Sequence, residues 1–156
     1  MEELYTTWKA IGVAGGDLSF FQDFFVKFYQ AFIEGDRWLQ YLNGVKTTLL
    51  VTALALILGI VLGVLVAMLR TAHDQQRPGH RNPILAVLNL ICKVYVTVIR
   101  GTPMMVQLLI MGFVIFASSR NFTMIGTLTL GINSGAYVSE IVRGGLMSVD
   151  KGQMEA

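Results

Sequence analysis

The run LLVTALALILGIVLGVLVAML, from Leu49 to Leu69, decides the fold because it contains no charged residue. At a rise of about 1.5 Å per residue, a helix of roughly 21 residues crosses a hydrocarbon core about 30 Å thick. A helix in the core of a soluble protein is seldom apolar on every side over such a length. The run therefore predicts a transmembrane helix, which we place at residues 47–69.

The composition of the whole chain agrees with a membrane setting. Of the 156 residues, 54% are hydrophobic and 14% are charged, whereas charged residues make up about 25% of soluble domains. We therefore expect the lipid bilayer as a partner of this chain, and no nucleic acid.

Two further segments predict membrane spans, at residues 103–119 and 122–142. The first is uncharged, and the second is uncharged as far as Ser139. The second segment also carries small and polar residues, which serve helix contacts inside a membrane bundle. These are Gly126, Gly131, Asn133, Ser134 and Gly135. The sequence thus predicts an all-α membrane protein with about three transmembrane helices.

The N-terminal segment, residues 1–41, has a different pattern. Its aromatic residues recur at helical spacing between polar ones, which predicts an amphipathic helix. They are Phe21, Phe24, Phe25, Phe28 and Phe32. Trp38 and Tyr41 follow this helix and favour a position in the membrane interface. Packing against another soluble domain is the alternative, because periodicity alone does not name the apolar partner.

The charges around the first span predict its orientation. The loop RTAHDQQRPGHRN, residues 70–82, holds three arginines and one acid, whereas the turn near Arg120 holds a single base. Basic loops stay in the cytoplasm, so this loop is expected inside and the N-terminus outside. Three spans then place residues 143–156 in the cytoplasm as well.

A structural corner is expected between the cytoplasmic loop and the second span. The run from Pro83 to Ile99 contains Lys93, and we interpret it as a helix lying on the inner membrane surface. The cluster Arg100, Gly101, Thr102 and Pro103 follows this run. Arg100 would lie near the headgroups, while glycine and proline provide the bend into the second span.

Glu140 is the acid that the third span carries. Tyr137 precedes it by three residues and Arg143 follows it by three, so the three side chains share a helical face. One interpretation is an intrahelical pair of Glu140 with Arg143. The other is that Glu140 faces a solute path and meets a cationic group, because an ionisable residue in a span is costly without such a use. Gln107 and Asn133 are the other polar groups that could line this path.

The remaining features predict little chemistry. Gly59 and Gly63 form a small-xxx-small pair, which is either a close helix contact or a chance spacing. Cys92 is the single cysteine and is expected to be a packed thiol. His73 and His80 are expected to be solvated, so we predict neither a metal site nor catalytic residues.

Three strings of the sequence resemble a known family. They are LNGVKTTLLVT from Leu42, VIRGTPMMVQLL from Val98, and GINSGAYVSEIVRGGLMSVDKGQMEA from Gly131. Together they resemble the permease subunits of ABC importers for polar amino acids, the histidine, glutamine, glutamate and arginine uptake family. The resemblance implies that residues 42–156 form part of a type I ABC importer transmembrane domain. It also implies that this segment is a piece of a permease subunit that ends inside the coupling loop.

The resemblance implies partners and a coupling site. In the family, the loop that begins at the matching Gly152, Gln153, Glu155 and Ala156 docks on a separate ATPase. No phosphate-binding glycine loop is present, so ATP is expected on that partner and no cofactor on this chain. The family further implies an external amino-acid-binding protein and a second permease subunit, identical or not. The expected location is a bacterial inner or plasma membrane. The alternative function is a small scaffold or assembly protein that transports nothing.

Overall fold

The computed structural model describes residues 1–76 and 82–148. All regular secondary structure in these two ranges is helical, which confirms the all-α prediction. The elements are α1 (Glu2–Val13), α2 (Phe20–Phe32), the 3₁₀ turn η1 (Glu34–Asp36), α3 (Arg37–Asp74), α4 (Pro83–Gly101), α5 (Met104–Ile110), the π-helical turn η2 (Met111–Ile115) and α6 (Phe122–Ser148). The chain divides into two compact units, Met1–Thr48 and Leu49–Ala156, and helix α3 contributes residues to both.

The N-terminal unit contains a helical hairpin that is closed by aromatic pairs. The ring of Tyr5 stacks on that of Tyr29 with centroids 4.2 Å apart, and Trp8 meets Phe25 edge-on at 5.4 Å. Lys9 also pairs with a carboxylate that follows α2, Glu34, and this side-chain hydrogen bond raises the pKa of Lys9 above its usual value. Helix α1 and this hairpin were not predicted from the sequence.

Helix α2 confirms the predicted amphipathic helix. A capping box begins it, in which the backbone N–H of Ser19 donates to the side chain of Gln22 at 2.9 Å. One face packs on α1, where Val26 is buried. The other face carries exposed phenylalanines at positions 20, 21, 24, 28 and 32. The hairpin therefore covers one apolar stripe of α2, while the second stripe stays largely exposed and only its last ring, Phe32, meets Tyr41 at 5.1 Å.

Helix α3 contains the uncharged run from Leu49 to Leu69 and continues to Asp74. The prediction that a loop begins at Arg70 is therefore wrong, because residues 70–74 extend the helix. His73 is not simply solvated either, since the side-chain amide of Asn89 donates to its Nδ1 at 3.0 Å. This contact ties the end of α3 to the helix that follows.

Helices α4 and α5 are separated by a short extended segment. Helix α4 ends at Gly101, the backbone is extended at Thr102 and Pro103, and α5 begins at Met104. By length and composition, α4 can cross a membrane, as can the segment Glu34–Asp74. The surface position of α4 stays a prediction.

The predicted second span forms a shorter helix than the sequence suggested. Helical structure runs over Met104–Ile115 and does not reach residue 119. A 12-residue helix lies below the usual lower limit of about 17 residues for a crossing. The helical part of the predicted second span is therefore shorter than a typical crossing, and the chain continues to α6 after Ile115.

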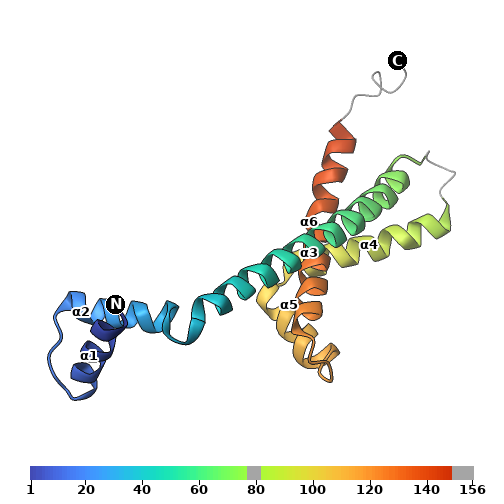
Figure 1. The fold of residues 1–156 in the computed structure, drawn as a ribbon. Helices are drawn as coiled ribbons and strands as arrows, with labels where there is room; N and C mark the ends of the chain where they lie inside the picture. The colour runs from blue at the N-terminus through green and yellow to red at the C-terminus, as the bar shows by residue number, and fades with distance from the viewer. Residues whose placement is uncertain (77–81, 149–156) are drawn as a thin grey trace. The chain divides into compact units, whose positions relative to one another are not determined.

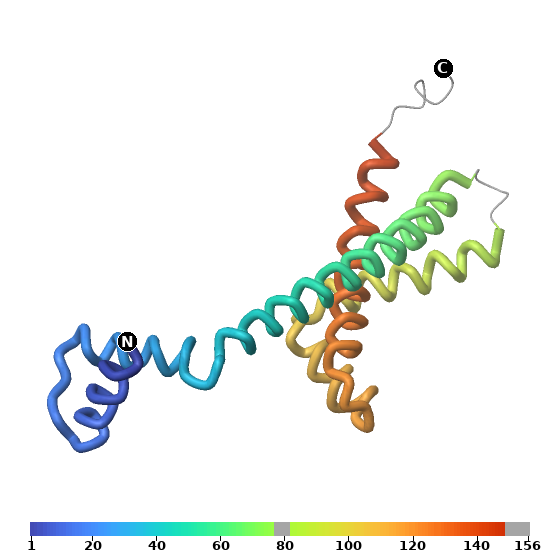
Figure 2. The backbone as a smooth tube through the Cα atoms, in the orientation of Figure 1, coloured from blue at the N-terminus to red at the C-terminus, as the bar shows by residue number. Residues whose placement is uncertain are grey.

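Within the C-terminal unit, α6 is the helix that the others contact (Figure 1). Its first half lies beside α5, and it packs against α4 and crosses α3. Figure 2 traces the backbone through the break between α4 and α5 and back along α6. The predicted third span, residues 122–142, lies inside α6. Buried residues on α6 are mostly small or polar, which agrees with the predicted position inside a bundle.

Candidate functional site

The middle of α6 approaches α3 through glycines. A Cβ placed on Gly63 would lie 2.6 Å from the Cβ of Val138, and one on Gly59 would lie 2.8 Å from the Cβ of Ser134. From the α6 side, a Cβ on Gly131 would lie 2.6 Å from Leu58, and one on Gly135 would lie 3.0 Å from both Leu62 of α3 and the Tyr95 hydroxyl of α4. Distances below 3.0 Å do not occur between real Cβ atoms and such neighbours. The small-xxx-small spacing therefore marks a close helix contact and is not a chance spacing.

This contact belongs to a stripe that runs along α3. The buried residues of the helix recur every fourth position, which places them on one face. They are Ala55, Gly59, Gly63, Ala67 and Thr71. Every member is small, so the two backbones can approach closely where lipid provides no hydrophobic drive for helix association.

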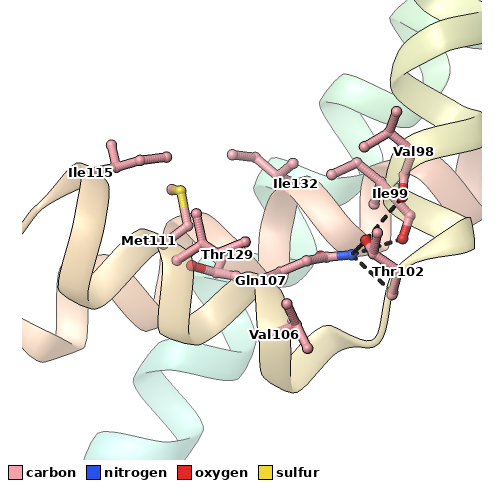
Figure 3. A pocket seen from close by; sticks show the side chains of 10 residues that line it. Val98, Ile99, Thr102, Val106, Gln107, Met111, Ile115, Thr129 and Ile132 are labelled. Carbon is pink, nitrogen blue, oxygen red and sulfur yellow. Dashed lines mark hydrogen bonds between the residues drawn. The ribbon is translucent and has the colours of Figure 1, made fainter.

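Gln107 closes the corner between α4 and α5 (Figure 3). Its side-chain nitrogen donates to the carbonyl oxygens of Ile99 at 2.7 Å and Thr102 at 3.1 Å, and to the Thr102 hydroxyl at 2.8 Å. The end of a helix leaves carbonyl groups without partners, and this amide satisfies two carbonyls at the corner. A mostly apolar cavity of about 230 Å³ lies beside Gln107.

Asn133 connects this corner to α6. Its side-chain nitrogen donates to Oε1 of Gln107 at 3.0 Å. At the preceding residue, the carbonyl oxygen of Ile132 accepts a hydrogen bond from the hydroxyl of Tyr95 on α4 at 2.5 Å. Asn133 also lines a second cavity of about 430 Å³, together with Thr52 and Tyr137. Asn133 and Tyr137, two of the predicted path residues, therefore line the same cavity. Gln107 is connected to this cavity by its hydrogen bond with Asn133.

The C-terminal half of α6 carries a charged cluster. Glu140 accepts a hydrogen bond from Arg70 of α3, and its other oxygen lies 3.8 Å from Nη1 of Arg100 on α4. Arg143 donates to Asp74 of α3 at 3.2 Å. The Arg70 side chain is only 11% exposed and that of Glu140 is 27% exposed, so water solvates this pair poorly. Five charged side chains from three helices thus form one cluster, in which three arginines lie around Glu140 and Asp74.

The two interpretations of Glu140 both omitted its main partner. The intrahelical contact exists, but Nε of Arg143 lies 4.0 Å from Glu140, whereas Arg70 of the neighbouring helix forms the hydrogen bond. Arg100, assigned to the corner, lies with its guanidinium 5.3 Å from the ring centroid of Tyr137. One signal pointed to the missed pair: Arg70 directly follows the uncharged run, and an ionisable group at that depth needs a partner.

The remaining residues named in the sequence predictions either lie outside the described residues or form no site. Gly152, Gln153, Glu155 and Ala156 lie outside the described residues, as does His80. No group of three or more metal-ligating side chains occurs in the described ranges. Cys92 is buried. The candidate site therefore consists of the cavity at Asn133 and Tyr137 and the charged cluster beyond it.

A bundle of apolar helices that is held by glycines and carries polar side chains on its inner helix is typical of a transport protein of the membrane. Sequence comparison defines the family. The chain is 38% identical over 118 residues to a Rickettsia prowazekii protein assigned to a glutamine transport system as its permease, covering 74% of this chain and 49% of that protein. It is 36% identical over 128 residues to the L-cystine transport system permease protein of Bacillus subtilis, covering 80% and 49%. No family model matches the chain.

A solved structure agrees with this assignment. A crystal structure of an amino acid ABC transporter with histidines superposes with a TM-score of 0.55 and 32% identity, covering 75% of this chain and 54% of that one. The chain belongs to the permease subunits of ABC transporters for polar amino acids. Such proteins are transport permeases and not enzymes, which favours the transporter over the scaffold alternative. The chain spans about half the length of the curated relatives it matches.

Proposed function

We propose that this chain forms part of the solute path in the permease subunit of an ATP-driven importer for polar amino acids. The observation that carries the proposal is the joint match in sequence and fold to amino-acid permeases over three quarters of the chain. Polar groups on α6 support it, because a helix that only faced lipid would not retain them.

The path itself is proposed along one side of α6. Asn133 and Tyr137 line a cavity large enough to admit a small solute, at about 430 Å³. Gln107 orients the Asn133 amide through their hydrogen bond. Glu140 lies one turn beyond Tyr137. Its carboxylate would attract the cationic part of a passing amino acid, which would take the place of Arg70 and Arg100 as its partner. The path thus offers amide, phenol and carboxylate groups in sequence.

The partners follow from the mechanism of the proposed importer. A separate ABC ATPase would bind ATP and contact Gly152, Gln153, Glu155 and Ala156, and an external amino-acid-binding protein would deliver the solute. A second permease subunit, identical or different, would complete the pathway. The proposed location is a bacterial inner or plasma membrane, where this chain crosses more than once.

The proposed orientation of the chain in the membrane has the N-terminus outside the cytoplasm. The contacts between α3 and α6 support the same direction for both helices, because they advance together from Gly59 and Ser134 to Asp74 and Arg143. If α3 and α6 cross the membrane in the same direction, the number of crossings counted from α3 to α6 is odd, as it is for the three predicted spans. The phenylalanine face of α2 would then lie in the outer membrane interface, since exposed aromatic rings favour that layer.

A labelling experiment tests the orientation. Gln75 is exposed after the end of α3, and a cysteine at this position in a Cys92→Ser background should be cytoplasmic. A membrane-impermeant maleimide should therefore label it only after the cells are lysed. A cysteine at Asp17, in the N-terminal segment, serves as the control and should be labelled in intact cells. The reverse pattern would contradict the orientation.

A charge reversal tests the transport function. In a subunit that carries this segment with the rest of a permease, Glu155→Lys should disrupt the ATPase contact, because one mispaired charge at an interface costs several kcal/mol. We expect loss of ATPase co-purification or of amino-acid-stimulated hydrolysis in vesicles, with normal membrane insertion. The control is Lys46→Gln, which changes an exposed charge far along the sequence. If the unmutated subunit binds no ATPase and moves no amino acid, a scaffold function replaces the proposal.

A further inference from the structure

A second polar pocket lies between α3, α4 and the end of α6, apart from the cavity at Asn133. It has a volume of about 230 Å³ and is lined by Arg70, Lys93, Val96, Thr97, Arg100 and Glu140. Three of these residues carry a positive charge and one carries a negative charge. The pocket therefore has an excess of two positive charges at neutral pH.

The carboxylate in the pocket does not neutralise these cations. Glu140 accepts its hydrogen bond from Arg70 and lies 3.8 Å from Arg100. Lys93 forms no ion pair with any residue in the described ranges. The neighbouring Arg143 adds no net charge, because it pairs with Asp74. At least one full positive charge, that of Lys93, thus remains available to an anion.

Arg70 also keeps a donor without a protein acceptor. Its Nε is buried and has no hydrogen-bond partner among the described residues. More than about nine in ten buried polar groups have a partner, so Arg70, which lines the pocket, is unusual in keeping hydrogen-bonding capacity that the protein does not use. A guanidinium and an ammonium on opposite walls are the groups that bind phosphate in proteins.

The pocket is open on its α4 side. Lys93, Thr97 and Arg100 recur at i, i+4 and i+7, which places them on one face of α4, and all three are exposed. The opposite wall is Arg70, which directly follows the uncharged run of α3. Cations at the end of an apolar run of this length lie at the depth of lipid headgroups.

We propose that this pocket binds a phosphate group, that of an anionic phospholipid headgroup. Arg70 and Arg100 would donate to the phosphate oxygens, Lys93 would supply the unpaired charge, and the Thr97 hydroxyl would add a neutral donor. Free inorganic phosphate offers the same oxygens and is the other source of this ligand. The site shares Arg70, Arg100 and Glu140 with the proposed solute path, but lipid binding in detergent is measured without transport, so either proposal can fail alone.

Native mass spectrometry of the purified chain in detergent tests the proposal. Bound phosphatidylglycerol is compared with bound phosphatidylcholine, for the unmutated chain and for Lys93→Gln. A basic side chain near an anionic lipid contributes about fivefold in affinity. We expect Lys93→Gln to bind phosphatidylglycerol about fivefold more weakly and phosphatidylcholine unchanged. Because Lys93 is exposed and holds no ion pair in the described ranges, the variant should keep its helicity by circular dichroism.

Lys46→Gln is the matched control, since Lys46 is also an exposed lysine on an apolar helix. It should retain the affinity of the unmutated chain for phosphatidylglycerol. An equal loss in both variants would reveal general charge attraction and overturn the proposal, as would an unchanged affinity in Lys93→Gln. Adding phosphate at constant ionic strength then separates the sources: displacement of the lipid identifies free phosphate as the ligand, and retention identifies the headgroup.

Discussion

The middle of α6 and its C-terminal half contact the same helix, α3, by opposite means. In the middle, Gly59 and Gly63 bring two backbones together with no charge involved. Toward the end, Arg70 reaches across to Glu140 and Asp74 to Arg143. The first contact needs small residues because lipid is as apolar as the helices, and the second needs complementary charges because lipid does not solvate ions. One helix pair therefore shows what a membrane bundle requires at its centre and near its edge.

The largest effect is expected at the charged end. Glu140→Gln removes the negative charge that pairs with the poorly exposed Arg70, and removing one charge of a buried ion pair costs about 3–5 kcal/mol. Since this pocket is partly open, we expect about 3 kcal/mol of lost stability, measured as the free energy of unfolding in mixed micelles. The exposed pair of Asp23 with Lys27 is the control, and Asp23→Asn should cost about 0.5 kcal/mol or less. Equal effects of the two substitutions would contradict the distinction.

The glycine contact should respond to size alone. Gly63→Ala introduces a Cβ 2.6 Å from that of Val138, so the helices must separate. Overpacking of this kind costs about 1–3 kcal/mol, measured in the same unfolding assay. Gly126→Ala on α6 meets nothing within 4 Å and should be neutral or should gain up to about 1 kcal/mol from helix propensity. Equal changes in the free energy of unfolding for the two alanine variants would contradict close packing at Gly63.

The amide contact between Gln107 of α5 and Asn133 of α6 should matter least. Asn133→Ala removes one hydrogen bond, while Gln107 keeps its bonds to Ile99 and Thr102. Hydrogen bonds between membrane helices average about 0.6 kcal/mol, so a loss of that size is expected in the unfolding assay. Gln107→Leu should cost more, because it also frees the carbonyl groups of the corner. A larger loss for Asn133→Ala than for Gln107→Leu would reverse this order.

Much of this fold could be predicted from periodicity and from helix breakers. The apolar core of α3, the amphipathic α2 and the small-residue face of α6 each carry their signal within one segment. Helix α1 was missed because Tyr5 and Trp8 find their aromatic partners on α2, a contact that no pattern within α1 shows. The partner of Glu140 was missed for the same reason, since a contact between Arg70 and an acid 70 positions away leaves no local pattern. Signals within one helix predict that helix, whereas its partners depend on the packing of the bundle.

Disulfide formation between α3 and α6 tests the central claim most directly. In a Cys92→Ser background, Gly59→Cys with Ser134→Cys places two Cβ atoms 2.8 Å apart, and a shift of under about 1 Å gives the usual separation of about 3.5–4.5 Å in a disulfide. Peptide mass spectrometry after mild oxidation should find these residues joined, with a yield that does not change on dilution. A pair of Gly126→Cys with Ser134→Cys, both on α6, should not join. Absence of the first cross-link, or a yield that falls on dilution, would contradict the glycine contact between α3 and α6.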